Sequence, residues 1–493
     1  MLFNSYIFLF GFLPLVLLAF YAVNLRSKRA ALAIVTLASL GFYAYWDVRF
    51  VPLMCGSIAF NYIVGHAIGK FHHRSILIFG ITMNLLLIGF FKYSLFAFQN
   101  LAPAVPPPAL LESLILPLGI SFWTFQQIAY LVDVQRRIVR PAPLDAHAFS
   151  MLFFPHLIAG PILRYAMVSR QYLRSSWPRH FLFKSFQVGV LIFAIGLFKK
   201  VVIADSLAPF AEAAFARAAV GELSPSDAWI GSISYSLQLY FDFSGYSEMA
   251  YGLARMFGIR IPINFNSPYQ AASILDFWRR WHMSLTGFFR TYVYLPLGGN
   301  RRGAARQIVN ILIVFFLTGV WHGAGWTFFV WGAGHGILVA VAHYWHRAVA
   351  PRLRSHDSRW LKFYLDNISP LLSRFATLFA VLCLWVVFRS TSFSSAWTMF
   401  KGMFFQSHGW SSVIFPELWL YKVIPVLLIA IGLFAVFGPN TFQISGRIRR
   451  LVIDPYSHAF TKTAVPAALV AFFLYFSIAS LSQKQATFLY YNF

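Results

Sequence analysis

The sequence predicts an all-α integral membrane protein that crosses the bilayer many times. Hydrophobic residues make up 59% of the 493 positions and charged residues only 11%, whereas a soluble domain carries roughly 25% charged residues. The mean hydropathy of +0.65 points the same way. Apolar runs of about 20 residues, the length that spans a bilayer as a helix, recur along the chain. We therefore expect one polytopic domain over residues 1–493.

Hydropathy predicts roughly eleven to thirteen spans. A further stretch, 147–163, contains Pro155, Gly160 and Pro161, so we expect it to be re-entrant or broken. The predicted spans are 6–24, 31–46, 50–69, 76–98, 112–132, 183–204, 227–256, 307–321, 326–346, 372–389, 420–438 and 463–482.

The basic residues fall mainly between these apolar runs. The chain carries 40 Lys and Arg against 15 Asp and Glu, and basic clusters follow the first, third and fifth spans. Cytoplasmic loops show this excess of positive charge. The charge therefore reflects orientation in a lipid bilayer, and no nucleic-acid partner is expected. Residues 26–29 place positive charge after the first apolar run, which predicts a retained span and not a cleaved signal peptide.

Common catalytic signatures are missing from the sequence. HExxH, Walker A, GxGxxG and GxSxG do not occur, so we expect no metal site of that type, no P-loop and no serine-hydrolase triad. Carboxylates inside apolar runs are rare, and Asp242 and Glu248 are the notable ones. Each is interpreted either as the wall of a polar cavity or as a structural hydrogen-bond node.

Residues 274–285 have the periodicity of an amphipathic helix lying in the membrane surface. His282 falls between its two faces, and Asp276 with Arg280 forms an i,i+4 pair. The polar face carries Asp276, Arg279 and Arg280, and the apolar face carries Ile274, Phe277, Trp278, Trp281 and Leu285.

Two histidines stand among glycines in a very apolar region. His322 lies in the sequence Trp-His-Gly-Ala-Gly-Trp over 321–326, and His335 lies between two glycines. On one straight helix the two would be about 20 Å apart. Gly323 and Gly325 weaken a helix just after His322, so we expect His322 at a helix end and His335 on the next helix. A titratable group in such surroundings indicates function, and His322 is the first candidate.

Several longer motifs also occur in order, and as a set they are specific. They are 116–122 (LPLGISF), 153–161 (FFPHLIAGP), 238–247 (QLYFDFSGYS), 264–269 (NFNSPY), 276–285 (DFWRRWHMSL), 295–301 (LPLGGNR), and WHG with GHG over 321–336. The chain resembles bacterial members of the membrane-bound O-acyltransferase (MBOAT) family, especially the branch that acetylates alginate and related exopolysaccharides.

The resemblance implies a helical fold around a central funnel or tunnel. It gives His322 the place of the family's essential histidine. His335 and His282 match the other recurrent histidines, and with Asp242 and Asp276 they are expected to support the site or line the tunnel. Thr291, where close relatives often carry Asp, and His156, where some carry Gln, are departures that bear on the substrate.

The resemblance further implies acetyl transfer. Acetyl-CoA would be the cytoplasmic donor substrate, with no permanently bound cofactor, and a separate periplasmic or membrane-anchored acetyltransferase would be the partner in the inner membrane of a bacterium. The acceptor would be an exopolysaccharide such as alginate, with peptidoglycan or cellulose as alternatives. The family's D-alanyl transfer branch fits less well, because its bacterial members are usually shorter.

His322 would act as general base, since an imidazole titrates near about pH 6.5, or would carry a transient acyl group. Arg279 and Arg280 would either steer the donor's phosphates or anchor the cytoplasmic face. A transporter of polysaccharide or lipid-linked sugar, without acyl chemistry, is the alternative from another class. Such proteins often contain inverted repeats, and none is evident in the sequence.

Overall fold

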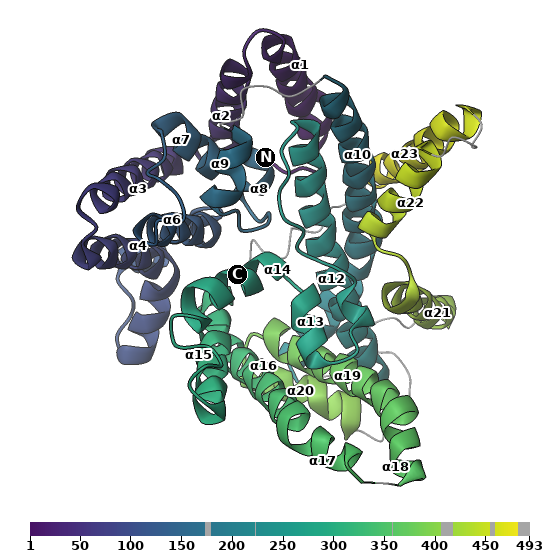
Figure 1. Cartoon of the computed structure of the whole chain (residues 1–493). Coiled ribbons are helices and arrows are strands. Elements are labelled where there is room, and N and C mark those ends of the chain that lie inside the picture. Colours follow the sequence, from purple (N-terminus) through teal and green to yellow (C-terminus); the bar gives the residue numbers. More distant parts are fainter. Residues whose placement is uncertain (173–178, 222, 357, 406–417, 454–458, 482–493) are drawn as a thin grey trace. The chain divides into compact units, whose positions relative to one another are not determined.

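The computed structural model describes residues 1–172, 179–221, 223–356, 358–405, 418–453 and 459–481 (Figure 1). Every regular element in these ranges is a helix, as the composition predicts. Contacts divide the chain into two units. Unit 1 comprises Met1–Val202, Ser244–Ile263 and the described residues from Thr441 onward, and unit 2 comprises Ile203–Phe243 and Asn264–Asn440. Each unit is assembled from separate stretches of chain, and the expected single domain stays a prediction.

Unit 1 is built mostly from the N-terminal part of the chain. Its helices are η1 (Ile7–Phe12), α1 (Leu13–Asn24), α2 (Lys28–Ala44), η2 (Val48–Phe50), α3 (Val51–Phe71), α4 (Arg74–Leu101), α5 (Ala109–Glu112), α6 (Ile120–Gln135), α7 (Leu144–Leu152), α8 (Phe154–Leu157), α9 (Tyr165–Tyr172), α10 (Arg179–Phe198), α22 (Thr441–Ile453) and α23 (Ala459–Leu481).

Two helices, η3 (Lys199–Ala204) and α12 (Pro225–Met256), contribute residues to both units. Within unit 1, the end of α12 packs on α10 through glycines. A Cβ on Gly252 would lie 2.6 Å from the carbonyl oxygen of Gly189, and a Cβ on Gly245 would lie 2.7 Å from that of Gly196. Glycine at these positions lets the two helix backbones touch, a common device in membrane helices.

Unit 2 contains the segments in which the sequence predicts the site. Besides the first part of α12, its helices are α11 (Asp205–Ala219), η4 (Pro268–Gln270), α13 (Ile274–Arg280), α14 (Met283–Phe289), η5 (Arg290–Tyr294), α15 (Ala304–His322), α16 (Trp326–Tyr344), η6 (Trp345–Val349), α17 (Ala350–Arg354), α18 (Arg359–Phe363), η7 (Tyr364–Ile368), α19 (Ser369–Arg389), α20 (Phe393–Phe404) and α21 (Leu418–Phe437).

The protein is a multi-pass membrane protein. In the described part of the chain, eight helices are long and apolar enough to cross a bilayer, or nine if one bent pair counts as a span. Hydropathy alone predicts roughly eleven to thirteen. The difference lies in α2 and α6, which have 17 and 16 residues, and in α12, which is long enough but whose serines, Gln238 and carboxylates lower its mean hydropathy. The stretch 147–163 is broken, as expected, because Phe153 separates the short helices α7 and α8.

Candidate active site

The helices α15 and α16 form a hairpin whose backbones are in contact. His322 is the last residue of α15, and Gly323 continues in an extended conformation. A Cβ on Gly332 would lie 2.4 Å from the carbonyl oxygen of Phe315, and a Cβ on Gly319 would lie 2.4 Å from that of Phe328. The predicted helix end at His322 is therefore confirmed, and the glycines determine how closely the two helices approach.

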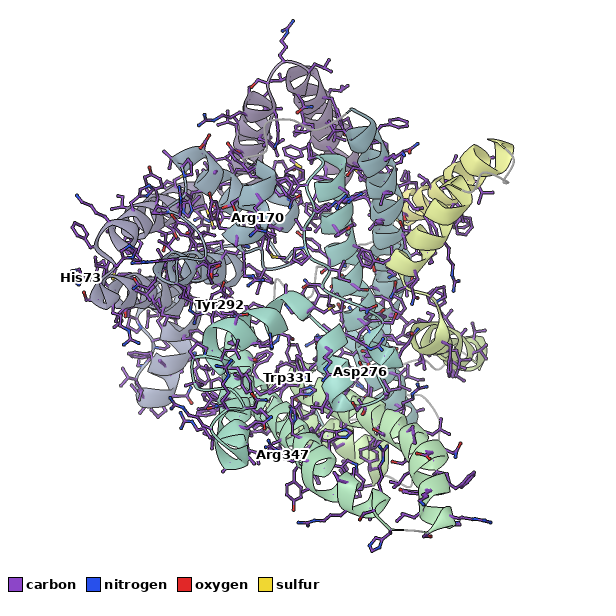
Figure 2. The ribbon with its side chains drawn as sticks, in the orientation of Figure 1. His73, Arg170, Asp276, Tyr292, Trp331 and Arg347 are labelled. Atoms are coloured by element: carbon purple, nitrogen blue, oxygen red, sulfur yellow. The ribbon has the colours of Figure 1, made fainter. Side chains whose placement is uncertain are left out.

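His322 is buried among aromatic rings. Only 3% of the residue is exposed. Its ring centroid lies 4.8 Å from that of Trp321, 4.9 Å from that of Trp331 and 5.2 Å from that of Phe388 on α19. Figure 2 labels Trp331 among the side chains of unit 2. A histidine held this way is shielded from bulk water, so a proton that it takes up must come from a group bound beside it.

His335 and His322 both contact the ring of Trp331, which places the two histidines close together. The Trp331 ring lies 4.9 Å from each imidazole, so the two histidine rings are at most about 10 Å apart, half the roughly 20 Å of a continuous helix. His335 is fully buried. Its Nδ1 accepts a hydrogen bond of 3.3 Å from the indole Nε1–H of Trp278 on α13. The hairpin thus brings together two groups that sequence spacing alone would separate.

The structure corrects the prediction of one amphipathic helix over 274–285. The helix breaks after α13, because Trp281 is extended and His282 takes a left-handed conformation with φ 42° and ψ 54°. That region is uncommon for residues other than glycine and is often found at functional sites. The five predicted apolar residues are indeed buried, but they lie inside the protein, and the helix break determines the position of His282.

His282 joins the same aromatic cluster. It is fully buried, and its ring lies 4.8 Å from that of Phe243 on α12 and 5.9 Å from that of Trp321. Burial lowers the pKa of His282 to about 3, so the imidazole is neutral at physiological pH. His282, Trp321, His322, Trp331 and His335 form a chain of contacting rings, which we call the histidine–tryptophan cluster.

Asp276 is engaged in the structure of α13. Its Oδ2 accepts hydrogen bonds from the Arg280 side chain at 2.9 Å and from the Ala272 backbone N–H at 3.1 Å. Burial acts to raise the pKa of Asp276, but the Arg280 and Ala272 bonds outweigh it and lower the pKa below its usual value. Arg279 is exposed. The predicted i,i+4 pair is confirmed, and the Asp276 carboxylate holds the Arg280 side chain against α13.

The two carboxylates on α12 differ in their surroundings. Glu248, in unit 1, forms a buried ion pair of 2.7 Å with Lys199 and accepts a hydrogen bond of 2.7 Å from Thr441. It is thus a structural node between three helices. Asp242, in unit 2, is buried and precedes Phe243, whose ring packs on His282. Of the two, Asp242 is the one next in sequence to a residue that contacts His282.

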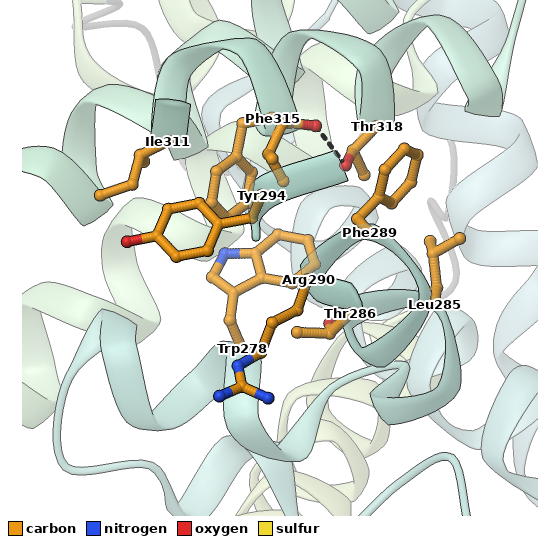
Figure 3. A pocket seen from close by; sticks show the side chains of 10 residues that line it. Trp278, Leu285, Thr286, Phe289, Arg290, Tyr294, Ile311, Phe315 and Thr318 are labelled. Carbon is orange, nitrogen blue, oxygen red and sulfur yellow. Dashed lines mark hydrogen bonds between the residues drawn. The ribbon is translucent and has the colours of Figure 1, made fainter. Parts of the chain in front are cut away.

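Figure 3 shows a small cavity in unit 2 together with the side chains that line it. It has a volume of about 120 Å³, and Trp278 and Phe315 form part of its wall. Both rings also contact His335, at 5.0 and 6.4 Å between centroids. Thr318, also on the wall, donates its hydroxyl to the Val314 carbonyl at 2.8 Å. Because ligand pockets commonly occupy roughly 300–1,000 Å³, this cavity can hold only a small chemical group.

A larger groove of about 840 Å³ lies between α16, α17 and α19. His346 and Arg354 are on its wall, and the remainder is largely apolar. Its volume falls within the usual range of small-molecule sites. In the described part of the chain, no group of three His, Cys, Asp or Glu residues is arranged to hold a metal ion.

Comparison with known proteins identifies the family. The model of the membrane-bound O-acyltransferase (MBOAT) family matches residues 67–357. The chain belongs to the MBOAT family. It is therefore an O-acyltransferase, and the matched region includes His282, His322 and His335.

The relatives cover most of the chain. A peptidoglycan O-acetyltransferase of Helicobacter pylori is 42% identical over 82% of this chain and 80% of its own length. A probable alginate O-acetylase AlgI of Azotobacter vinelandii is 39% identical, over 90% and 86% respectively. A teichoic acid D-alanyltransferase of Bacillus subtilis is 29% identical over 50% of this chain and 62% of its own length. The acetylases therefore match more of the sequence, and at higher identity.

Several members of the site were not predicted. Trp278 appeared only as a residue of an apolar face, and Trp331, Trp385 and Phe388 were not singled out. Trp331 and His335 are four residues apart on α16, a spacing that places them on one helix face. That signal was available in the sequence. The contacts of Trp278 with His335 and of Phe388 with His322 join residues more than 50 positions apart, and local periodicity carries no information about them.

Proposed function

We propose that this MBOAT protein takes acetyl groups from acetyl-CoA on the cytoplasmic side of a bacterial inner membrane and passes them to hydroxyl groups of a polysaccharide outside. The observation that carries the proposal is the burial of His322 at the end of α15, inside the region that defines the family. The family accounts for O-acyl transfer, and the acetylase relatives suggest the acetyl group and the polysaccharide.

In the proposed mechanism His322 acts as the general base. The acceptor hydroxyl gives its proton to the imidazole while its oxygen attacks the thioester carbonyl carbon. The carbon–sulfur bond then breaks, the sulfur leaves with the electron pair, and the imidazolium returns the proton to it. General-base catalysis of this kind contributes about 10²–10⁴-fold. A route through an acetyl-imidazole on His322 uses the same residue and is the second form of the proposal.

The groove between α16, α17 and α19 supports entry of the donor from the cytoplasm. Basic residues are frequent from η6 through α18, including Arg347, Arg352 and Lys362, and such a segment is expected on the cytoplasmic side. Arg354 on the groove wall matches the negative phosphates of acetyl-CoA in charge, and the His346 imidazole on the same wall offers a hydrogen-bond donor. The 840 Å³ volume suits a ligand of that size class. Arg279, which is exposed, and Arg280, which is engaged with Asp276, are weaker candidates for this role.

The proposed acceptor is an extracytoplasmic polysaccharide. One relative is named for peptidoglycan and another for alginate, so both polymers are candidates, and cellulose is a third. A separate periplasmic or membrane-anchored acetyltransferase, which the family resemblance implies, is the proposed partner that completes the transfer.

The test reconstitutes the full chain in vesicles with its partner and acetyl-CoA labelled in the acetyl group. Wild-type protein should transfer label to the polysaccharide, and His322→Ala should lower the rate about 10²–10⁴-fold. His356→Ala, which alters an exposed histidine, is the matched control and should retain full activity. Undiminished label transfer by His322→Ala would refute the assignment of the base, and sugar movement without acetyl turnover would refute the proposed function.

A further inference from the structure

The hydrogen bond between Trp278 and His335 determines where the imidazole carries its proton. An indole nitrogen can only donate, and a neutral imidazole has one donor and one acceptor nitrogen. Trp278 Nε1–H points to His335 Nδ1 at 3.3 Å. Nδ1 must therefore be the acceptor, and the proton must be on Nε2.

That Nε2–H has no acceptor among the residues that the structure describes, although His335 is fully buried. A buried donor left without a hydrogen bond is unfavourable, and each such group needs an explanation. The surrounding rings of Phe277, Trp331 and Trp385 offer only π faces, and contacts with these are weak. The geometry therefore points to a bound ligand that brings an acceptor oxygen.

We propose that Trp278 fixes His335 as a hydrogen-bond donor to the carbonyl oxygen of the acyl group in transfer. This inference rests on the proposed function and divides the work between the two histidines. His322 takes the proton of the attacking hydroxyl, and His335 Nε2–H binds the oxygen on which negative charge develops. Trp278 is a positioning residue, because it acts on the substrate only through His335.

Atoms and charge balance without a further reactant. When the acceptor oxygen bonds to the carbonyl carbon, the carbonyl π electrons move onto its oxygen, and His335 Nε2–H donates a hydrogen bond to that oxyanion without giving up its proton. When the carbonyl re-forms, the carbon–sulfur bond breaks and the thiolate receives the proton held by His322. His335 ends the step in the protonation state in which it began.

The separation of the two histidines suits this division. A carbonyl group and its attacking hydroxyl, with one hydrogen bond at each end, span on the order of 8 Å. The two imidazole centroids, each 4.9 Å from Trp331, are at most about 10 Å apart, so one acyl group with its hydroxyl can reach both. Trp278 and Phe315, whose rings both contact His335, form part of the wall of the 120 Å³ cavity, which has room only for a small group such as a short acyl chain.

The first test examines the tautomer and needs no substrate. Nitrogen NMR of full-length protein with ¹⁵N-labelled histidine in vesicles, with His335→Gln identifying the signal, should show His335 protonated on Nε2. Trp278→Phe, which keeps a ring but removes the N–H, should produce a mixture of tautomers. Trp229→Phe is the matched control, because Trp229 Nε1–H donates to the Met403 carbonyl at 3.0 Å elsewhere in unit 2. A His335 signal protonated on Nδ1 in the wild type would overturn the proposal.

The second test measures transfer kinetics. His335→Phe keeps an aromatic ring without a donor, and its kcat should fall about 10²–10³-fold, the loss typical of one oxyanion donor. KM should change little, because the bond strengthens only in the transition state. His335→Gln, which offers an amide N–H, should recover part of the loss. Trp278→Phe should lower kcat by less than His335→Phe does, and Trp229→Phe should not lower it.

The two proposals fail in different ways. Full activity in His335→Phe overturns the donor role while acetyl transfer stands. The donor role is also overturned if the pH–rate profile of His335→Phe no longer shows the pKa of a general base, because His335 would then be that base. Absence of acetyl transfer by the wild type with its partner overturns the proposed function, and the NMR result still decides the tautomer.

Discussion

Replacing Gly332 with alanine adds one methyl group at the point where α15 and α16 touch. The new Cβ would lie 2.4 Å from the Phe315 carbonyl oxygen and 3.0 Å from the Gly319 Cα. Both atoms belong to the backbone, so neither can move aside as a flexible side chain does. Relief requires the two helices to separate or to slide.

The size of the effect follows from these distances. Ordinary contact of a Cβ begins at 3.4 Å, so the helices must shift by about 1 Å, and overpacking of this kind destabilises by about 1–3 kcal/mol. Trp331, the preceding residue, contacts both His322 and His335. Because misplacement of a catalytic group by about 1 Å can lower a rate 10²-fold, we expect Gly332→Ala to lose up to that factor in acetyl transfer.

The assay pairs the apparent Tm in detergent with label transfer in vesicles. Gly89→Ala is the matched control, because Gly89 is inside the membrane helix α4 and a Cβ there meets nothing within 4 Å. Alanine at that position should be neutral or stabilising by up to about 1 kcal/mol. If Gly332→Ala matched Gly89→Ala in both Tm and rate, the close approach of α15 and α16 would not be what holds the site.

Two further predictions concern stability. Burial lowers the pKa of His282 to about 3, so between that value and about 6.5 the unfolded chain binds a proton that the folded chain does not. The contribution of neutral His282 to the free energy of unfolding is complete above about pH 6.5 and has fallen by about 2 kcal/mol at pH 5. The apparent Tm of His282→Gln should therefore decline less than that of wild type between pH 7.5 and 5. An equal decline in the two proteins would contradict this prediction. Glu248→Ala leaves the Lys199 ammonium buried and should destabilise by about 3–5 kcal/mol, whereas the double variant Glu248→Leu, Lys199→Met should lose much less in the same melting experiment; similar losses would show that packing, and not the unpaired charge, is responsible.

Much of the architecture was predictable because hydropathy is a local quantity. Most of the predicted spans correspond to helices that pass the length and hydropathy test. The differences have local causes as well. The helix α6 is short, and α12 contains many serines besides its carboxylates and is too polar on average, so neither passes as a span although both form helices.

The predicted helix over 274–285 shows where periodicity misleads. Its apolar face was identified correctly, because the five residues are buried. The break at Trp281 and His282 was not identified, because neither residue is a helix breaker by propensity. A left-handed conformation at His282 persists only when surrounding contacts enforce it, and the Phe243 and Trp321 rings that contact it come from other helices.

The sequence by itself determined the membrane class, the positions of most helices and the helix end at His322, because these depend on hydrophobic runs and glycines that act within a few residues. Only the tertiary structure decided that His282, His322 and His335 share one cluster of tryptophans and that Trp278 donates to His335. Those contacts depend on how closely the helices approach one another, and between α15 and α16 that distance is determined by the missing side chains of Gly319 and Gly332.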